Sequence, residues 1–381
     1  MGLLLRAAAR PWRGTRARIT WISVAVCVGR LGAAAGPASD TLFDAFQHPS
    51  NGKPFAYWWW KGNAATEPEI SRQLDLLQGA GFAGAHIFPL GKSVGTADWL
   101  STPWWQTVRF AVTEAKRRNM EIDINAGYGW PSGGTFVRPE HRLQGISCAI
   151  EEVTGPGAYA KTLDEFLAPN LDGERSFAFV RLVPKRLERR EQIIDLSDRI
   201  DGRALRFNVP AGDYVLYAGI HRANARPLKV SGRKDDYALD YFNQEAVKQY
   251  LAHFEETSRV ALGARLGELF HAFFVSSVEI WPSNWTTAFA AEFRRRRGYD
   301  LAPYAHFALG LYPIPLYQAK NYRPDLFTAS PALADEIRRI RYDYTKTLVE
   351  LFQQNFVETI QQWCRAQGVR YATSGIAEGA Q

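Results

Sequence analysis

The chain has 381 residues, a length that suits one large or two ordinary domains. Its composition, 46% hydrophobic and 22% charged residues, is that of a globular protein and excludes intrinsic disorder. The net charge is +7, but six arginines and no acidic residue precede Ser39, so the other 40 basic residues nearly balance the 39 acidic ones. The basic excess therefore belongs to the N-terminus, and we exclude a nucleic-acid-binding face.

The N-terminus has the pattern of an export signal. Residues 1–18 are rich in arginine, residues 19–28 form an apolar run, and residues 33–38 offer small-residue cleavage sites. The apolar run is too short to span a bilayer, so we expect no stable membrane anchor. The sequence predicts a signal peptide over residues 1–38 and a periplasmic or extracellular protein.

Strand-like and helix-like patterns then alternate. Apolar runs at Pro54–Trp60, Gly84–Leu90 and Glu121–Ala126 predict buried strands. Helical spacing follows Thr66 and again follows Pro103. Thr66-Glu-Pro-Glu69 reads as a capping box, in which the threonine hydroxyl and the second glutamate satisfy backbone amides reciprocally. This alternation with short links predicts βα units and a parallel sheet.

A glycine-rich loop, Gly127–Gly134, directly follows the third predicted strand. It lacks the lysine and hydroxyl ending of a phosphate-binding loop. Its Tyr128 and Trp130 are candidates for stacking on a ligand, although the loop can equally be a structural turn. From about Ile150 to Asp236 the pattern changes to short, partly alternating runs separated by Pro-Gly turns, which predicts an antiparallel β insertion.

Helical and strand patterns return after the insertion. We expect a helix over Gln244–Leu266, a strand over Ala272–Glu279, a helix ending at Gly298, a long helix over Ala332–Gln367 and a strand over Val369–Thr373. The strand predicted over Ala272–Glu279 places Glu279 at the C-terminal end of a buried strand. A parallel α/β barrel presents a catalytic acid in this way, whereas the alternative is a carboxylate that caps or ion-pairs at a strand end.

The sequence contains five predicted strand–helix units, whereas a TIM barrel closes with eight. We therefore predict an α/β fold of the (β/α)8 TIM-barrel type, truncated after about five units and carrying an inserted antiparallel β subdomain. The alternative is a complete five-stranded α/β protein. The expected organisation is a signal peptide over residues 1–38, barrel over 39–149, β subdomain over 150–236 and incomplete barrel over 237–381.

Four passages in order resemble the α-L-rhamnosidases of glycoside hydrolase family 106. They are Tyr57-Trp-Trp-Trp60 with Ala80–Phe88, Gly129-Trp-Pro-Ser-Gly-Gly134 with Val137-Arg-Pro-Glu140, Ser276-Ser-Val-Glu279 with Arg296–Tyr304, and Arg341–Tyr344 with Trp363-Cys364. The chain departs from the family's pattern at Ser276-Ser277, where Asp-Ser is common, and at His86, where an acidic residue is common.

The resemblance implies an exported, calcium-dependent, inverting glycosidase on a (β/α)8 barrel, acting on a carbohydrate substrate. Inversion requires one carboxyl group to protonate the leaving oxygen and another to activate water, about 6.5–9.5 Å apart. Glu279 matches the acid. Glu378 is the late carboxylate available as a second catalytic group, and the resemblance identifies no calcium ligands in this chain.

Five further side chains are candidates for substrate binding. His86 could bind a sugar hydroxyl or be a satisfied structural histidine. Asp123 and Asn125 share one face of their strand, where they could meet substrate or bond within the barrel. Trp130 and Trp285 are candidate stacking platforms or core residues.

Two other features allow alternative interpretations. The run Arg294–Arg297 could form an anion-binding patch or complement a helix dipole before Gly298. Cys148 and Cys364 lack metal-ligand spacing, and a disulfide between them stays open.

The sequence thus favours an exported glycoside hydrolase that removes terminal rhamnosyl residues from glycans or glycosides. The alternative is a catalytically inactive, exported carbohydrate-binding or scaffold protein. A lyase acting on acidic polysaccharide is a third interpretation, which the near-neutral charge beyond the N-terminus disfavours.

Overall fold

A computed structural model describes residues 43–44, 46–47, 52–91, 93–166, 173–224, 236–276, 283–310 and 326–374. The chain divides into two units, Met1–Gly52 and Lys53–Gln381, and the architecture below is that of the second unit. The predicted signal peptide lies outside the described residues. Within the described ranges, no helix combines the length and apolarity needed to cross a membrane.

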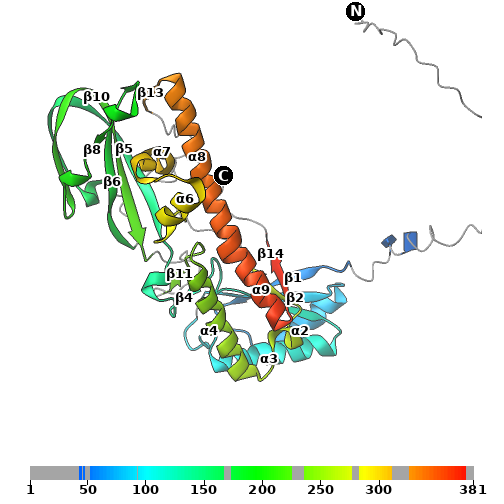
Figure 1. Ribbon diagram of the computed structural model, residues 1–381. Helices are drawn as coiled ribbons and strands as arrows, with labels where there is room; N and C mark the ends of the chain where they lie inside the picture. The colour runs from blue at the N-terminus through cyan, green and yellow to red at the C-terminus, as the bar shows by residue number, and fades with distance from the viewer. Residues whose placement is uncertain are drawn as a thin grey trace, which may run out of the picture. The chain divides into compact units, whose positions relative to one another are not determined.

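Five parallel strands form the central sheet (Figure 1). In sheet order they are β1 (Phe55–Lys61), β2 (Gly84–Leu90), β3 (Glu121–Asn125), β12 (Ala272–Val275) and β14 (Arg370–Thr373). The predicted parallel sheet is confirmed, since all four neighbouring pairs run in the same direction. In the described part of the chain the sheet is open, with β1 and β14 at its edges. Closure into an eight-stranded barrel therefore stays a prediction.

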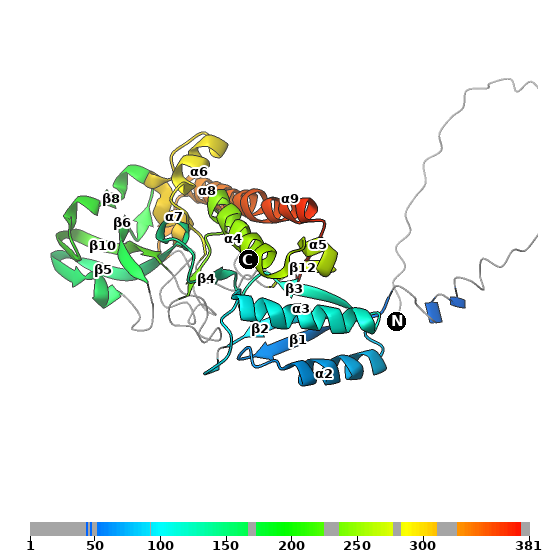
Figure 2. The ribbon, with the colours of Figure 1, turned by 90° about the horizontal axis from the view of Figure 1, so that it is seen from below.

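One face of this sheet forms the main core of the unit. Alternate strand residues such as Trp58, Ile87, Ile124 and Phe273 are buried there. Four helices cover them, namely α2 (Glu67–Gly79), α3 (Thr102–Arg117), α4 (Gln244–Leu262) and α9 (Glu358–Gln367) (Figure 2). Helix α4 ends earlier than predicted because Gly263 adopts the left-handed conformation at φ 63°, and the short helix α5 (Leu266–Leu269) follows.

The predicted capping box at the start of α2 is wrong. Thr66 has the extended backbone of an N-cap, but its side chain makes no cap hydrogen bond. Glu69 instead accepts hydrogen bonds from the Arg72 guanidinium, at 2.7 and 2.6 Å, and from the Gln73 amide at 2.6 Å. A guanidinium one turn away offers a charge-assisted bond, which outcompetes a neutral backbone amide for the carboxylate.

A second sheet is antiparallel, with the order β5-β10-β6-β8. Its strands are β5 (Gly145–Thr162), β10 (Ala204–Ala223), β6 (Glu174–Pro184) and β8 (Ile194–Asp195), with β9 (Ile200–Asp201) paired to β10. Two of the short runs in the predicted insertion, residues 204–209 and 213–218, form one strand, because the segment between Val209 and Gly212 makes a bulge rather than the expected Pro-Gly turn. The sequence did not indicate β5, whose second half is rich in glycine, alanine and proline.

The predicted long helix is confirmed with one local change. It comprises α8 (Pro331–Leu351), a π-helix over Phe352–Val357, and α9. Gly368 ends it in the left-handed conformation, at φ 70°. Helix α6 (Phe289–Arg297) ends in the same way at Gly298, and α7 (Ala305–Leu309) follows it.

The remaining short elements are two strand pairs and five 3-10 turns in the described part of the chain. The pairs are β4 (Gly133–Gly134) with β11 (Tyr237–Ala238) and β7 (Arg186–Leu187) with β13 (Thr328–Ala329). The 3-10 turns lie at Pro139–His141, Leu163–Phe166, Arg190–Gln192, Ser197–Arg199 and Ala302–Tyr304.

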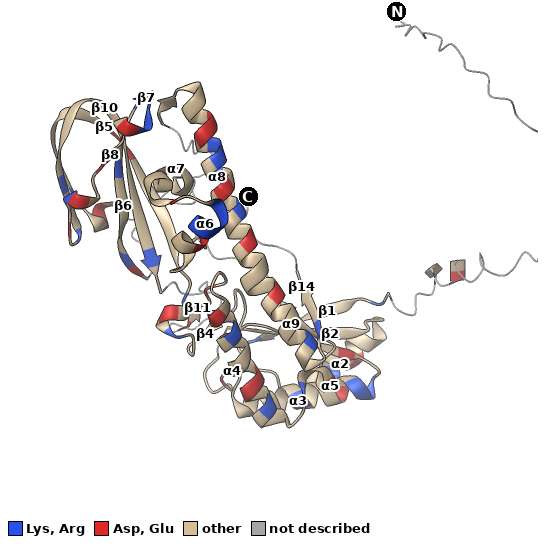
Figure 3. Ribbon diagram, viewed as in Figure 1, with Lys and Arg blue, Asp and Glu red and all other residues tan. Residues whose placement is uncertain are grey.

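The arginines at the end of α6, blue in Figure 3, form ion pairs with acidic side chains of the protein. Arg295 and Arg296 pair with Glu292 of the same helix, at 2.6 and 3.1 Å. Arg297 pairs with Glu350 of α8 at 2.5 Å. The run therefore joins α6 to α8, and this structure favours the intramolecular interpretation over an anion-binding patch.

Cys148 and Cys364 are free, and the disulfide left open above is not formed. Cys148 lies in the core beneath the antiparallel sheet, and Cys364 lies in the core beneath the parallel sheet. Burial raises the pKa of the Cys364 thiol to about 12, so this thiol stays protonated at neutral pH. Both cysteines act as small apolar core residues.

Candidate functional site

The second face of the parallel sheet carries a mixed set of aromatic and polar side chains. This polar–aromatic face consists of Tyr57, Trp59, His86, Phe88, Asp123, Asn125 and Phe274, which alternate with the core residues on the other face. Tyr57 and Trp59 remain 50% and 51% exposed. Large aromatic side chains this exposed on a sheet are typical of a binding surface rather than of a core.

Trp59, Phe88 and Trp130 form an aromatic cluster at the carboxyl end of β1 and β2. The rings of Trp59 and Phe88 stack with centroids 5.8 Å apart. Trp130 lies 5.6 Å from Phe88 and 6.3 Å from Trp59. The predicted stacking residue is thus brought beside a half-exposed tryptophan, and the stacked Trp59 and Phe88 rings with the tilted Trp130 ring line an apolar surface of the kind that packs against sugar rings.

Asn125 holds the loop that presents Trp130. Its Nδ2 donates to the carbonyl oxygens of Gly127, at 2.7 Å, and Gly129, at 3.1 Å. Gly129 has a φ of 72°, which the turn requires, and its amide donates to the Pro89 carbonyl of β2. Asn125 is fully buried, and its Oδ1 has no hydrogen-bond partner among the described residues.

His86 lies beneath this surface with unsatisfied ring nitrogens. It is 2% exposed, and neither nitrogen has a hydrogen-bond partner in the described part of the chain. Its ring contacts those of Phe274, 4.0 Å away, and Tyr57, 4.9 Å away. Burial lowers the pKa of His86 to about 4, and the nearby Asn125 side chain opposes this only in part. The imidazole is therefore neutral at neutral pH and can donate one hydrogen bond and accept another.

This depressed pKa predicts an acid-sensitive fold. An unfolded histidine has a pKa near 6.5, so between about pH 6.5 and 4 the unfolded chain binds more protons than the folded one, and stability falls as the pH falls. We expect His86 to account for about 3 kcal/mol of this loss. Urea unfolding at pH 4.5 and 7.5 should show a smaller difference for His86→Gln than for the parent. An equal difference would assign the acid sensitivity elsewhere, His306 being another buried histidine with a lowered pKa.

Asp123 is engaged in a hydrogen bond within the protein. Its Oδ1 accepts from His271 Nδ1 at 2.8 Å, and the other ring nitrogen of His271 lies 2.6 Å from Arg370 Nη1. Burial raises the pKa of Asp123, while His271 opposes the rise. His271 immediately precedes β12, so this contact ties β3 to β12 towards the amino ends of the strands. A role for Asp123 in substrate binding stays a prediction, and the contact supports a structural role.

Trp285 lies with a different set of residues. It forms a backbone bridge with Gln144, and its ring packs on Phe289 with centroids 4.9 Å apart. It is part of the packing around the core beneath the antiparallel sheet. The structure does not bring Trp285 to the cluster around Trp130.

The two predicted catalytic carboxylates, Glu279 and Glu378, lie outside the described residues. Strand β12 ends at Val275, and Ser276 precedes the segment that carries Glu279. The carbonyl of Phe274 accepts from the Ala126 amide at 2.7 Å, so the described end of β12 adjoins the start of the Trp130 loop. Their catalytic roles stay predictions.

The described residues identify no ligands for the calcium ion that the resemblance implies. Within those ranges, no group of three or more histidine, cysteine, aspartate or glutamate side chains is placed to hold a metal ion. Calcium prefers six to eight oxygen ligands, largely carboxylates and carbonyls. Calcium therefore stays a prediction from the resemblance alone.

Comparison with known proteins now decides the family. The model of glycoside hydrolase family 106, described as alpha-L-rhamnosidase, matches residues 47–175 and 172–379. The chain belongs to this family. The resemblance drawn from the four sequence passages is confirmed.

Two relatives of this family-106 chain have informative names. A protein of Formosa agariphila named "Putative beta-glucuronidase" is 23% identical over 386 aligned positions, covering 91% of this chain and 32% of the relative. The solved structure of a rhamnosidase from Novosphingobium sp. PP1Y matches with a TM-score of 0.53 at 16% identity, covering 87% of this chain and 47% of that one. At this identity the match shows a shared mixed α/β fold. The chain spans about a third of the curated relative and about half of the solved one.

Four residues of the polar–aromatic face were missed in the sequence, namely Tyr57, Trp59, Phe88 and Phe274. The run Tyr57–Trp60 was interpreted as a uniformly buried strand because all four side chains are aromatic. Strand alternation was the available signal, since it places Tyr57 and Trp59 on the face opposite Trp58 and Trp60. In this family-106 chain, sequence reasoning found the loop residue Trp130 but not the strand residue beside it.

Proposed function

We propose that the protein containing this chain is an exported, inverting glycoside hydrolase that removes terminal α-L-rhamnosyl residues from glycans or glycosides. Family membership supports a glycoside hydrolase acting on a carbohydrate substrate. The proposal rests on one observation about the site: the aromatic cluster of Trp59, Phe88 and Trp130 lies beside buried polar atoms of His86 and Asn125 that have no hydrogen-bond partner among the described residues. Buried polar atoms without partners are rare in proteins, and a ligand hydroxyl would satisfy them.

The chemistry follows from the two predicted carboxyl groups. Glu279 acts as the general acid that protonates the glycosidic oxygen as the bond to the anomeric carbon breaks. A second carboxylate, for which Glu378 is the candidate in this chain, removes a proton from the water that attacks the opposite face of the sugar ring. The aromatic cluster orients the ring, and the neutral His86 exchanges hydrogen bonds with a hydroxyl group.

The decisive assay compares substrates on the full-length protein. We expect hydrolysis of an aryl α-L-rhamnoside, with the first-formed sugar of inverted anomeric configuration by proton NMR. Retained configuration would contradict the inverting mechanism. A parent protein that binds L-rhamnose but hydrolyses no glycoside would instead support the carbohydrate-binding alternative.

A β-glucuronide is the second candidate substrate. The name of the Formosa agariphila relative points to it, and so does Lys61, the last residue of β1. By strand alternation Lys61 lies on the same face as Tyr57 and Trp59, where its ammonium group could pair with a uronate carboxylate. Hydrolysis of an aryl β-D-glucuronide that Lys61→Gln weakens, with rhamnoside hydrolysis unchanged, would favour this candidate.

Removal of the half-exposed tryptophan tests the binding surface. We expect Trp59→Ala to raise the KM or the Kd for the sugar roughly twofold to tenfold, because stacking on an aromatic face contributes about 0.5–1.5 kcal/mol. Tyr342→Ala is the matched control, since Tyr342 is a 65% exposed aromatic residue on α8. Equal affinities for Trp59→Ala and the parent would remove the aromatic cluster from the substrate site.

A further inference from the structure

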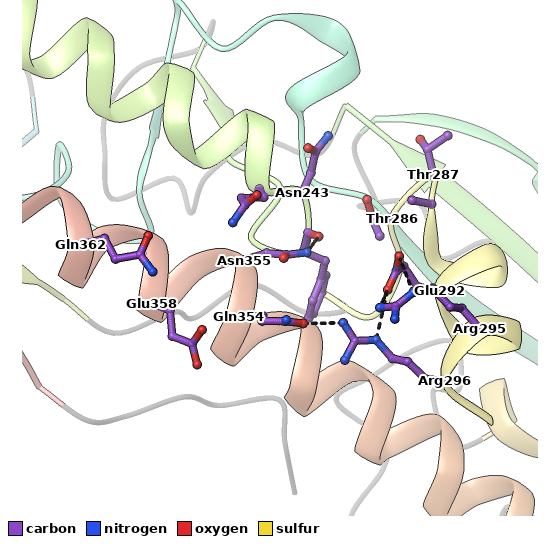
Figure 4. Close-up of a pocket in the computed structure, with 13 residues that line it drawn as sticks. Asn243, Thr286, Thr287, Glu292, Arg295, Arg296, Gln354, Asn355, Glu358 and Gln362 are labelled. Atoms are coloured by element: carbon purple, nitrogen blue, oxygen red, sulfur yellow. Dashed lines mark hydrogen bonds and ion pairs between the residues drawn. The ribbon is translucent and has the colours of Figure 1, made fainter.

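A cavity of about 620 Å³ lies between the start of α4, helix α6 and the π-helix with the first turns of α9 (Figure 4). It shares no residue with the polar–aromatic face or with the strands of the parallel sheet. Its volume is in the range of small-molecule sites in proteins. It is therefore a second candidate binding site, independent of the proposed catalytic function.

One wall is a regular row of hydrogen-bonding side chains. Gln354, Glu358 and Gln362 are spaced four residues apart along the π-helix and α9, so they lie on one helical face. Figure 4 shows Asn243 and Thr287 on other segments around the same space. Polar groups that converge from several elements on one cavity are the usual arrangement of a ligand site.

The formal charges of the lining cancel. Glu292 accepts from Arg295 at 2.6 Å and from Arg296 at 3.1 Å. Arg296 also donates to Gln354 at 2.5 Å. Together with Glu358, the cavity has two carboxylates and two guanidinium groups, so its lining favours neither an anion nor a cation.

Several polar groups of the lining have capacity for a ligand. Glu358 and Gln362 form no hydrogen bond or ion pair with any other residue drawn in Figure 4. Asn355 uses its Nδ2 to bond the Phe242 carbonyl at 2.6 Å, which leaves its Oδ1 as an acceptor. Asn243 uses its Oδ1 to cap α4, which leaves its Nδ2 as a donor. The lining therefore offers both donors and acceptors, which suits hydroxyl groups because each hydroxyl both donates and accepts.

The π-helix supplies two of the amide side chains that line this wall of the cavity. An i→i+5 segment is rare and is frequently found at functional sites within α-helices. Here it carries Gln354 and Asn355, while Phe356 of the same segment is buried in the core. The irregularity thus presents two amides to the cavity without loss of the helix.

We propose that this cavity binds a neutral, hydroxyl-rich ligand, namely a sugar unit held by Glu358, Gln362 and the amides of the π-helix. The Glu358 carboxylate accepts from two neighbouring hydroxyl groups, and the amides bond those that remain. The ligand is a free monosaccharide or one residue of a neutral glycan chain, which share this chemistry.

The test is a binding titration of the full-length protein by calorimetry, with L-rhamnose as the probe. It is performed in a Trp59→Ala background, which weakens binding at the aromatic cluster, and dependence on Glu358 and Gln362 then distinguishes binding in the cavity from binding that remains at the cluster. We expect saturable binding that Glu358→Gln weakens roughly tenfold, since it removes a charged acceptor, and that Gln362→Ala weakens about threefold to tenfold. Gln353→Ala is the matched control, because Gln353 is an exposed glutamine of the same π-helix that does not line the cavity.

Two further probes identify the ligand. Tighter binding of a rhamnose-containing tetrasaccharide than of L-rhamnose would assign the cavity to a glycan chain, and equal binding would assign it to a free sugar. Binding of D-glucuronate as tight as that of L-rhamnose would overturn the proposal that the cavity selects a neutral sugar. Absence of binding in the Trp59→Ala background, or binding that neither Glu358→Gln nor Gln362→Ala changes, would overturn the site. Unchanged circular dichroism and Tm confirm that the variants fold.

Discussion

Replacing Glu279 by glutamine should abolish most hydrolysis while leaving sugar binding in place. Glutamine has nearly the shape of glutamic acid but cannot donate a proton to the leaving oxygen. General acid catalysis contributes roughly 10²- to 10⁴-fold, and we expect kcat to fall by that factor with little change in KM. Steady-state kinetics on the full-length protein measure kcat and KM, and titration with L-rhamnose measures binding.

The leaving group provides a sharper signature of the acid. A nitrophenolate departs without protonation, whereas an alkoxide does not, so Glu279→Gln should damage hydrolysis of an alkyl rhamnoside far more than that of a nitrophenyl rhamnoside. Glu268→Gln is the control, because Glu268 is an exposed carboxylate in α5, shortly before β12. An equal loss on both substrates would assign Glu279 a role other than general acid, and full retention of kcat would remove it from the reaction.

Replacing Phe254 by alanine should give the largest loss of stability. Its ring is fully buried and lies 5.4 Å from Trp105 of α3 and 5.1 Å from Phe273 of β12. It therefore joins two helices to the sheet, and its truncation leaves a cavity that rigid neighbours cannot fill. We expect the free energy of unfolding to fall by about 3–5 kcal/mol in urea titrations.

Val260 provides the comparison on the same helix. It is 69% exposed, and Val260→Ala should change the free energy of unfolding by no more than about 0.5 kcal/mol. Similar values for the two variants would mean that α4 is not held to the sheet through Phe254.

The elements governed by local rules could be predicted from the sequence. Ile70 and Leu74 are buried on α2 as their spacing indicates, and Gly298 and Gly368 end helices in the left-handed conformation that glycine tolerates. The parallel order of β1, β2 and β3 followed from their alternation with helices. In these cases a few neighbouring residues contain the whole physical cause.

The remaining features depend on contacts between distant residues. The hydrogen bond between Asp123 and His271 joins positions 148 apart, and no local pattern marks His271 as its partner. The cavity lined by Asn243, Glu292 and Glu358 likewise arises only when α4, α6 and α9 come together. Trp285 was a candidate stacking platform or core residue, and only its packing on Phe289 places it with another core.

The alternation of the four aromatic residues Tyr57–Trp60 has a consequence for how this strand can vary in sequence. Trp58 and Trp60 are buried beneath helices, whereas Tyr57 and Trp59 are half exposed on the opposite face. Stability of the fold therefore constrains Trp58 and Trp60. The residues at positions 57 and 59 can vary with the ligand that the exposed face binds. Mutagenesis confined to Tyr57 and Trp59 should change ligand specificity with little loss of stability, because neither side chain is part of the buried core.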